Sequence, residues 1–209
     1  MLITAHGGAL GTGRNTQRYF DTIKDYKIDA IEVDVQRKKD LLYIAHTPKI
    51  RVKKAITLEY VFEYIKENDL KVNCDLKRKG LIKAVLSLAK KKGVEDRIIF
   101  TGSMSPHDIK NLTVGQAYLN SGFFFPLLPF SRNLPTIKRV ITNLDNPQIK
   151  GINIRHNYCS DEMLEMAEKV ELSLSVYTVD KPEAIKRLKA KTPIANITTN
   201  NITEITNKK

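Results

Sequence analysis

Cysteine and long apolar segments are both scarce in this sequence. Cys74 and Cys159 are its only cysteines, which is too few for a metal-binding cluster, so we expect two reduced, buried thiols. No segment is apolar over the length of a membrane span. The first residues, from Met1 to Ala5, lack the basic and then apolar pattern of a signal peptide. These absences favour a globular domain in the cytoplasm.

Several common catalytic patterns are also missing. There is no Gly-x-Ser-x-Gly motif, which argues against a serine hydrolase of the nucleophile-elbow type. The glycine-rich loop at 7–13 does not have the spacing of a phosphate-binding P-loop. Cys74 alternates with Asp75 along one segment and should point away from the face that carries the carboxylate. Catalysis by a serine or cysteine nucleophile is therefore disfavoured.

The charge balance is strongly positive, with 35 lysine and arginine residues against 23 acidic ones and a net charge of +12. Such an excess favours an anionic partner: a phosphate substrate, an acidic membrane surface or nucleic acid. The lysine runs at 38–39, 53–54 and 90–92 lie at predicted turns or helix ends, without interleaved aromatic residues. We therefore expect mainly solvated surface charges and no nucleic-acid partner.

Short β-rich runs alternate with segments of helical periodicity along all 209 residues. The helical segments include 15–26, 81–91 and 136–143, and others are expected to begin after Thr57, Ser105, Ser160 and Asp180 as capping residues. Eight strand–helix units predict one domain over 1–209, a (βα)8 TIM barrel, with an extra strand arm after the second strand. A doubly wound open sheet is the alternative. The expected strands are 3–5, 29–35, 41–45, 72–76, 98–100, 116–119, 151–154, 174–178 and 194–197.

Polar residues recur where the predicted strands end, and this is the edge at which such barrels place their active sites. In the strand 29–35, Glu32 and Asp34 share one face, while the residues between them are apolar. Asp75 lies similarly in the next strand. Carboxylates gathered inside a barrel repel one another, and a hard divalent cation would remove that cost. Glu32, Asp34 and Asp75 therefore predict a Mg²⁺ or Ca²⁺ site.

Four histidines are present, and two of them fall near this predicted site. His6 ends the first strand. His46 ends the extra arm, which would fold back towards the barrel mouth after the turn at 38–40. Two imidazoles beside a metal suit general acid and base catalysis of phosphoryl transfer, with the two roles open between them. His107 is expected to be structural, and His156 lies just past a strand end.

These residues occur in segments that resemble the glycerophosphodiester phosphodiesterase family, a phosphatidylinositol-phosphodiesterase-like group of TIM barrels. The resemblance implies hydrolysis of a glycerophosphodiester to glycerol 3-phosphate and an alcohol. It implies that Glu32, Asp34 and Asp75 hold the metal and that His6 and His46 are the acid–base pair. It also implies that Lys77 and Tyr177 meet the substrate. The matching segments are 5–8, 15–16, 29–35, 45–46, 57–59, 73–77, 175–180 and 197–200.

The sequence departs from the family at several points. Gly7 stands where the family usually has arginine, and Arg14 stands where it usually has glutamate. We expect Arg14 to take over the missing phosphate contact, because arginine suits bidentate binding of phosphate. Asp75 is more typical of the related sphingomyelinase D-type phospholipases. Two alternatives remain open: a phospholipase D-like reaction that forms a cyclic phosphate, and a barrel that binds a phosphodiester without turnover.

The connection after His46 is short, running only from Thr47 to Ile56, where the family usually carries a substrate-covering insertion. This predicts an open mouth that accepts a bulky, lipid-derived or membrane-bound phosphodiester better than the small substrates usual for the family. The same connection carries four basic residues, which would favour peripheral contact with an anionic membrane. They are Lys49, Arg51, Lys53 and Lys54.

Overall fold

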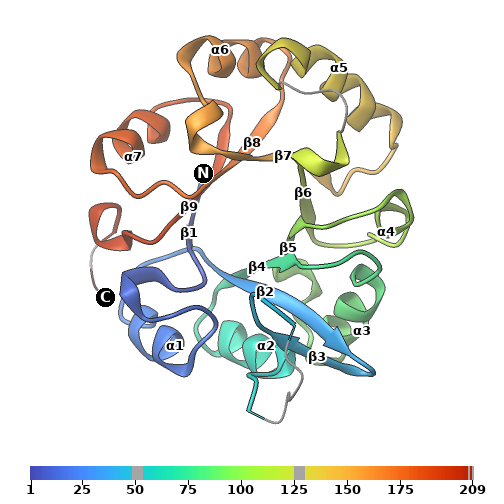
Figure 1. The fold of residues 1–209 in the computed structure, drawn as a ribbon, viewed down its shortest axis with the longest axis vertical. Coiled ribbons are helices and arrows are strands. Elements are labelled where there is room, and N and C mark those ends of the chain that lie inside the picture. Colours follow the sequence, from blue (N-terminus) through green and yellow to red (C-terminus); the bar gives the residue numbers. More distant parts are fainter. Residues whose placement is uncertain (49–53, 125–129, 207, 209) are drawn as a thin grey trace.

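The computed structural model describes residues 1–48, 54–124, 130–206 and 208. This part of the chain forms a closed barrel of eight parallel strands surrounded by helices, which confirms the expected TIM barrel (Figure 1). The barrel closes because the first strand pairs in parallel with both the second and the last. The barrel strands are β1 (Leu2–Ala5), β2 (Ala30–Lys38), β4 (Lys71–Leu76), β5 (Ile98–Gly102), β6 (Gln116–Asn120), β7 (Ile149–Arg155), β8 (Ser173–Tyr177) and β9 (Ile194–Thr199).

Helices connect successive barrel strands and form the outer ring. Thr57, Ser105 and Ser160 each accept a hydrogen bond from a backbone N–H in the first turn of the following helix, which confirms the expected caps. Among the described residues, no helix is long and apolar enough to cross a membrane. The helices are α1 (Gln17–Ile23), α2 (Leu58–Glu67), α3 (Ile82–Lys92), α4 (Pro106–Lys110), α5 (Phe130–Asn143), α6 (Asp161–Lys169) and α7 (Pro182–Lys189).

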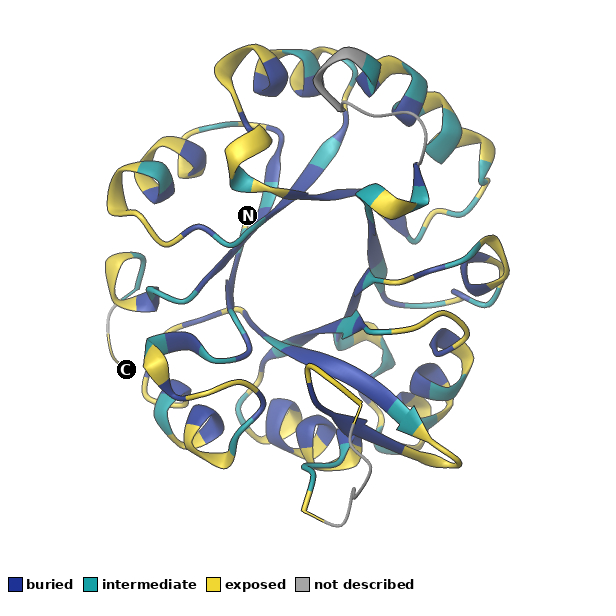
Figure 2. Ribbon diagram, in the orientation of Figure 1, coloured by how far each residue is buried: buried dark blue, intermediate teal, exposed yellow. Residues whose placement is uncertain are grey.

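The two faces of the barrel strands bury different kinds of side chain. Ile31, Val33 and Val35 point from β2 towards the helices and are fully buried. The helices bury the side that faces the barrel and expose the other (Figure 2). The interior of the barrel carries buried polar side chains instead, and they are hydrogen-bonded: Thr4 Oγ1 donates to Asn196 Oδ1 at 2.7 Å. The apolar core therefore lies between strands and helices, and polar groups line the barrel.

The extra arm is β3 (Leu41–Ile44), which pairs antiparallel with β2 and lies outside the barrel beside α2 (Figure 1). Lys39 turns the chain between the two strands with a φ of +52°. After β3, Ala45 N donates to Asp34 O at 2.9 Å. This bond confirms that the arm folds back, and it places His46 at the barrel mouth.

Three local expectations were wrong. The first helix covers only Gln17–Ile23 rather than 15–26, because Asn15 adopts a left-handed φ of +54° and cannot continue a helix. Helix α5 begins at Phe130, well before 136, and contains Pro135. Asp180 does not cap α7: Lys181 holds the N-cap position, and the Asp180 carboxylate accepts hydrogen bonds from Asn200 instead.

Candidate active site

Three carboxylates converge at the carboxyl ends of β2 and β4. The parallel register of these strands places Asp34 directly beside Asp75, with Glu32 two residues earlier on the same face. One oxygen from each of the three lies within 4.8 Å of the others. The expected convergence is therefore observed, and the role of the three as metal ligands stays a prediction.

Lys77 bridges two of these carboxylates. Its Nζ lies 2.5 Å from Asp34 Oδ1 and 2.6 Å from Asp75 Oδ2. Burial alone would lower the pKa of Lys77, but Asp75 and Asp34 together raise it above its ordinary value. For Asp34, burial would raise the pKa, yet hydrogen bonds from Lys77 and Asn15 lower it. Lys77 and Asp34 are therefore both charged, and Lys77 holds the two aspartates in place.

One oxygen of Glu32 remains without a partner among the described residues. Its Oε2 atom is buried and makes no hydrogen bond among the described residues. Burial, followed by the charges of Asp75 and Asp34, raises the pKa of Glu32 to about 8. A buried carboxylate oxygen without a partner is costly. A divalent cation between the three carboxylates would supply the missing partner, so these residues fit such an ion.

Asn15 holds Asp34 from two directions. Its Nδ2 donates to Asp34 Oδ2 at 2.7 Å, and its Oδ1 accepts from the Asp34 backbone N–H at 3.1 Å. The left-handed backbone of Asn15, which asparagine tolerates better than most residues, turns the side chain inward. The sequence analysis placed Asn15 only in a predicted helix and in a matching segment, whereas the structure shows it holding Asp34 in position.

His6 is held by a chain of side chains from the last two strand ends. Its Nδ1 lies 2.8 Å from Asn200 Oδ1, and Asn200 Nδ2 donates to Asp180 Oδ2 at 2.9 Å. Because the amide nitrogen is directed to Asp180, the amide oxygen must accept from His6, so Nδ1 carries the proton. Burial lowers the pKa of His6 below its ordinary value, although the bond to Asn200 opposes the shift. The ring is therefore neutral, and Nε2 is the basic atom.

Asn200 and Asp180 were not predicted as site residues. Asn200 entered the sequence analysis only within the matching segment 197–200, and Asp180 was expected to cap a helix. The signal for both is their position, since each lies just past the carboxyl end of a barrel strand, where sites form.

His46 lies between a cation and an anion. Arg14 Nη1 is 3.0 Å from His46 Nδ1, and Asp34 Oδ2 is 3.5 Å from the same nitrogen. Arginine can only donate, so its contact requires an unprotonated Nδ1, whereas the contact with Asp34 requires a protonated one. Arg14 therefore lies within the site, beside the second histidine, and its contact with phosphate stays a prediction.

The mouth encloses a cavity of about 220 Å³, which we call the polar cavity. Tyr177 lines it together with Glu32, Asp75 and Lys77, so this expected substrate residue does face the site. Amide and hydroxyl side chains complete the lining. They are Asn73, Thr101, Asn120, Asn153 and Thr198.

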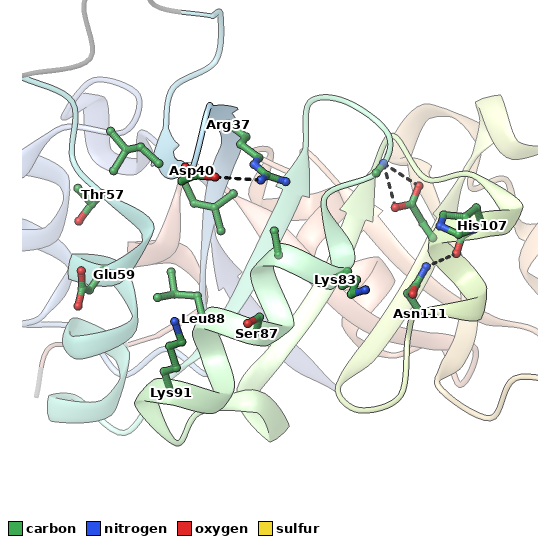
Figure 3. A pocket seen from close by; sticks show the side chains of 15 residues that line it. Arg37, Asp40, Thr57, Glu59, Lys83, Ser87, Leu88, Lys91, His107 and Asn111 are labelled. Carbon is green, nitrogen blue, oxygen red and sulfur yellow. Dashed lines mark hydrogen bonds and ion pairs between the residues drawn. The ribbon is translucent and has the colours of Figure 1, made fainter.

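A larger cavity of about 610 Å³ lies on the outside of the barrel, between the β2–β3 arm and the helices α2, α3 and α4. We call it the outer groove (Figure 3). It contains His107, but the Asp108 carboxylate beside it accepts from Gly80 N at 2.9 Å and from Ser105 Oγ at 2.6 Å. Those bonds complete a helix cap. The outer groove is therefore larger than the polar cavity, but its described residues include no cluster of converging carboxylates like that of Glu32, Asp34 and Asp75.

No protein-family model matches the chain, and no curated protein matches it in sequence. Solved structures do match in fold. A phosphodiesterase of Oleispira antarctica, in complex with the product sn-glycerol-3-phosphate, has a TM-score of 0.72 and 14% identity, covering 98% of this chain and 95% of that one. A glycerophosphodiester phosphodiesterase of Parabacteroides distasonis has a TM-score of 0.71 and 16% identity, with coverages of 97% and 93%. One of Agrobacterium tumefaciens has a TM-score of 0.70 and 16% identity, with coverages of 97% and 98%.

These likenesses establish the class of fold: a TIM barrel of the kind found in glycerophosphodiester phosphodiesterases. The resemblance expected from the segments around His6, Glu32 and His46 is thus confirmed in the fold of nearly the whole chain. The alternative of a doubly wound open sheet is excluded, because β1 closes the barrel.

Proposed function

We propose that this protein is a metal-dependent phosphoric diester hydrolase that converts a glycerophosphodiester into glycerol 3-phosphate and an alcohol. The observation that carries the proposal is the buried Oε2 atom of Glu32, which has no partner in the described part of the chain and lies beside Asp34 and Asp75. The fold shared with glycerophosphodiester phosphodiesterases supports it. So does the Oleispira antarctica neighbour, whose bound product is sn-glycerol-3-phosphate.

Glu32, Asp34 and Asp75 would hold the divalent cation, Mg²⁺ or Ca²⁺, since carboxylate oxygens suit both ions. When bound, such an ion polarises a phosphoryl oxygen and neutralises charge that develops on it. Lys77 and Arg14 add positive charge for the phosphate. Tyr177 lines the cavity in which one ester arm would lie.

The hydrogen bonds favour one assignment of the two histidines. His6 is neutral with a free Nε2, so it is the general base. His46 is the general acid. When phosphate draws Arg14 away from His46 Nδ1, that nitrogen is free to take a proton and pair with Asp34, 3.5 Å away. The protonated ring can then donate from Nε2 to the leaving alcohol.

Phosphorus NMR of the products tests the proposal. The protein is incubated with mixed glycerophosphodiesters in Mg²⁺, in Ca²⁺ and in a chelator. Hydrolysis gives the resonance of glycerol 3-phosphate in metal only, and His6→Ala abolishes it. A cyclic phosphate resonance would favour the phospholipase D-like alternative. Metal-dependent binding without any product would favour a phosphodiester-binding barrel.

Two expectations from the sequence stay predictions. Peripheral contact with an anionic membrane was based largely on Lys49, Arg51 and Lys53, which lie outside the described residues. The cytoplasmic location was based on the absence of a signal-peptide pattern. Binding to anionic vesicles at low and high salt tests the first, since charge-driven contact weakens with salt.

A further inference from the structure

A second cavity adjoins the polar cavity at the proposed phosphate position. It has a volume of about 380 Å³ and shares Asp75, Lys77 and Asn120 with its neighbour. It opens between the loops that follow β4, β5 and β6, and we call it the side pocket. Asp75 and Lys77 therefore form a ridge with one cavity on each side.

Gly102 keeps the side pocket open against this ridge. Its φ is +85°, a conformation that side-chain-bearing residues rarely adopt. A Cβ atom at this position would collide with Asp75 Oδ1 and with the backbone of Leu76. Gly102 N donates to Asn120 Oδ1 at 2.9 Å, which ties this loop to the end of β6. The space beside Asp75 is thus a built feature of the fold.

The two cavities differ in chemistry. The polar cavity is lined by asparagine and threonine side chains, which both donate and accept hydrogen bonds and so suit a polyol. In the side pocket, Met104 and Phe123 lie beside the polar residues Ser103 and Ser121, with Lys79 exposed at the rim. Phe123 therefore offers an apolar contact in the side pocket to an alcohol without hydroxyl groups.

We propose that the side pocket binds the leaving alcohol and selects uncharged or anionic alcohols over cationic ones. The proposal rests on the proposed function. A phosphodiester carries two ester arms, and a phosphate placed over Asp75 and Lys77 directs one arm to each side of the ridge. The glycerol arm occupies the polar cavity, and the alcohol occupies the side pocket.

The charges around the side pocket account for the selection. A cationic alcohol needs a free carboxylate or a cage of aromatic rings. Among the described lining residues, the only carboxylate is Asp75, which is already paired with Lys77 at 2.6 Å. Phe123 is the only aromatic ring there. Lys79 adds a positive charge at the rim, so a quaternary ammonium group is repelled and an anion is attracted.

Two substrates of equal shape isolate the effect of charge. They are the glycerol 3-phosphate esters of choline and of 3,3-dimethylbutanol, in which carbon replaces the quaternary nitrogen. We expect kcat/KM to be higher for the uncharged ester. Lys79→Glu should reduce this preference by roughly threefold to tenfold, the size expected when an exposed charge contact is reversed. Lys83→Glu, the same charge change in the outer groove, should leave the preference unchanged.

The outcomes separate this proposal from the proposed function. A preference for choline in the wild-type protein, or equal shifts in Lys79→Glu and Lys83→Glu, overturns the side pocket as a charge-selective subsite while hydrolysis stands. If no ester is cleaved, the proposed function fails. The ratio of dissociation constants for the two esters, measured by calorimetry with the same variants, then decides the subsite. A protein that binds neither ester refutes both proposals.

Discussion

The barrel mouth and the outer groove contain the same kinds of side chain, but they use them differently. Each has an aspartate and a histidine, and the outer groove is the larger cavity. In the groove, both oxygens of Asp108 accept from the backbone N–H of Gly80. At the mouth, Glu32 Oε2 is buried without a partner among the described residues.

This difference shows that cavity size alone does not distinguish the proposed active site from the larger outer groove. The polar groups of the outer groove complete the fold, because Asp108 both caps α4 and fixes the loop before α3. At the mouth, Glu32 Oε2 has no partner among the described residues, and a bound ligand would supply one. Matched substitutions in the barrel mouth and in the outer groove test this contrast.

The largest effect is expected for the aspartates. Asp34→Ala removes one proposed metal ligand and the partner of Lys77 and Asn15. We expect calorimetry to show no specific Mg²⁺ or Ca²⁺ binding and the assay to show no turnover. Asp108→Ala should instead lower the free energy of unfolding by about 0.5–2 kcal/mol, as for other lost caps, with metal affinity unchanged. Unchanged metal affinity in Asp34→Ala contradicts the metal site.

The next largest effect is expected for the histidines, whose variants should differ in kcat. His46→Asn removes the proposed general acid, and we expect kcat to fall by about 10²–10⁴-fold, the usual contribution of such a group. His107→Asn alters an exposed histidine of the outer groove and should leave kcat unchanged. Steady-state kinetics on both variants, with melting curves to verify folding, decides the point. Equal activities would remove His46 from the mechanism.

The lysine at the mouth should couple stability to metal binding. Lys77 holds Asp34 and Asp75 together when no metal is bound, and its Nζ contacts oxygens that the metal would need. We expect Lys77→Met to melt at a lower temperature than wild type in a chelator and yet to bind metal more tightly. Lys83→Met, in the outer groove, should change neither quantity. A weaker metal affinity in Lys77→Met would show that lysine and metal do not compete.

The smallest effect is expected in the dependence of stability on pH. Because the pKa of Glu32 rises from 4.5 to about 8 in the folded protein, folding favours its protonated form. The folded state then binds more protons than the unfolded chain between these values, so stability falls as pH rises through this window. Glu32→Gln removes this penalty, and its melting temperature in chelator should exceed that of wild type by a margin that grows with pH. Saturating metal should remove the margin, and a margin independent of pH would contradict the assignment.

Most of the barrel and the carboxylates could be predicted from the sequence, because both follow from strand periodicity. In β2, apolar residues alternate with Glu32 and Asp34, and this alternation alone indicates which side chains face inward. Asp180 shows where such reasoning fails. It precedes a helix and has the chemistry of a cap, but its partner Asn200 lies 20 residues away along the chain.

The predicted start of α5 was wrong for a related reason. A proline normally ends a helix or lies in its first turn, so Pro135 makes 136 a natural boundary. The structure instead places Pro135 inside a helix that begins at Phe130. Packing of the helix against the barrel, where Leu134 and Ile137 are fully buried, outweighs the local preference.

The pairing register of β2 and β3 sets the position of His46, the proposed general acid. Glu32 and Asp34 lie on one strand, and His46 follows the other, joined by the bond from Ala45 N to Asp34 O. A shift of one residue in the pairing of β2 with β3 would move the His46 imidazole along the strand by about 3.3 Å. It would also turn the ring to the opposite face of the hairpin. A change in the length of the exposed turn at 38–40 would therefore abolish the proposed acid catalysis by His46 without altering any residue of the proposed site.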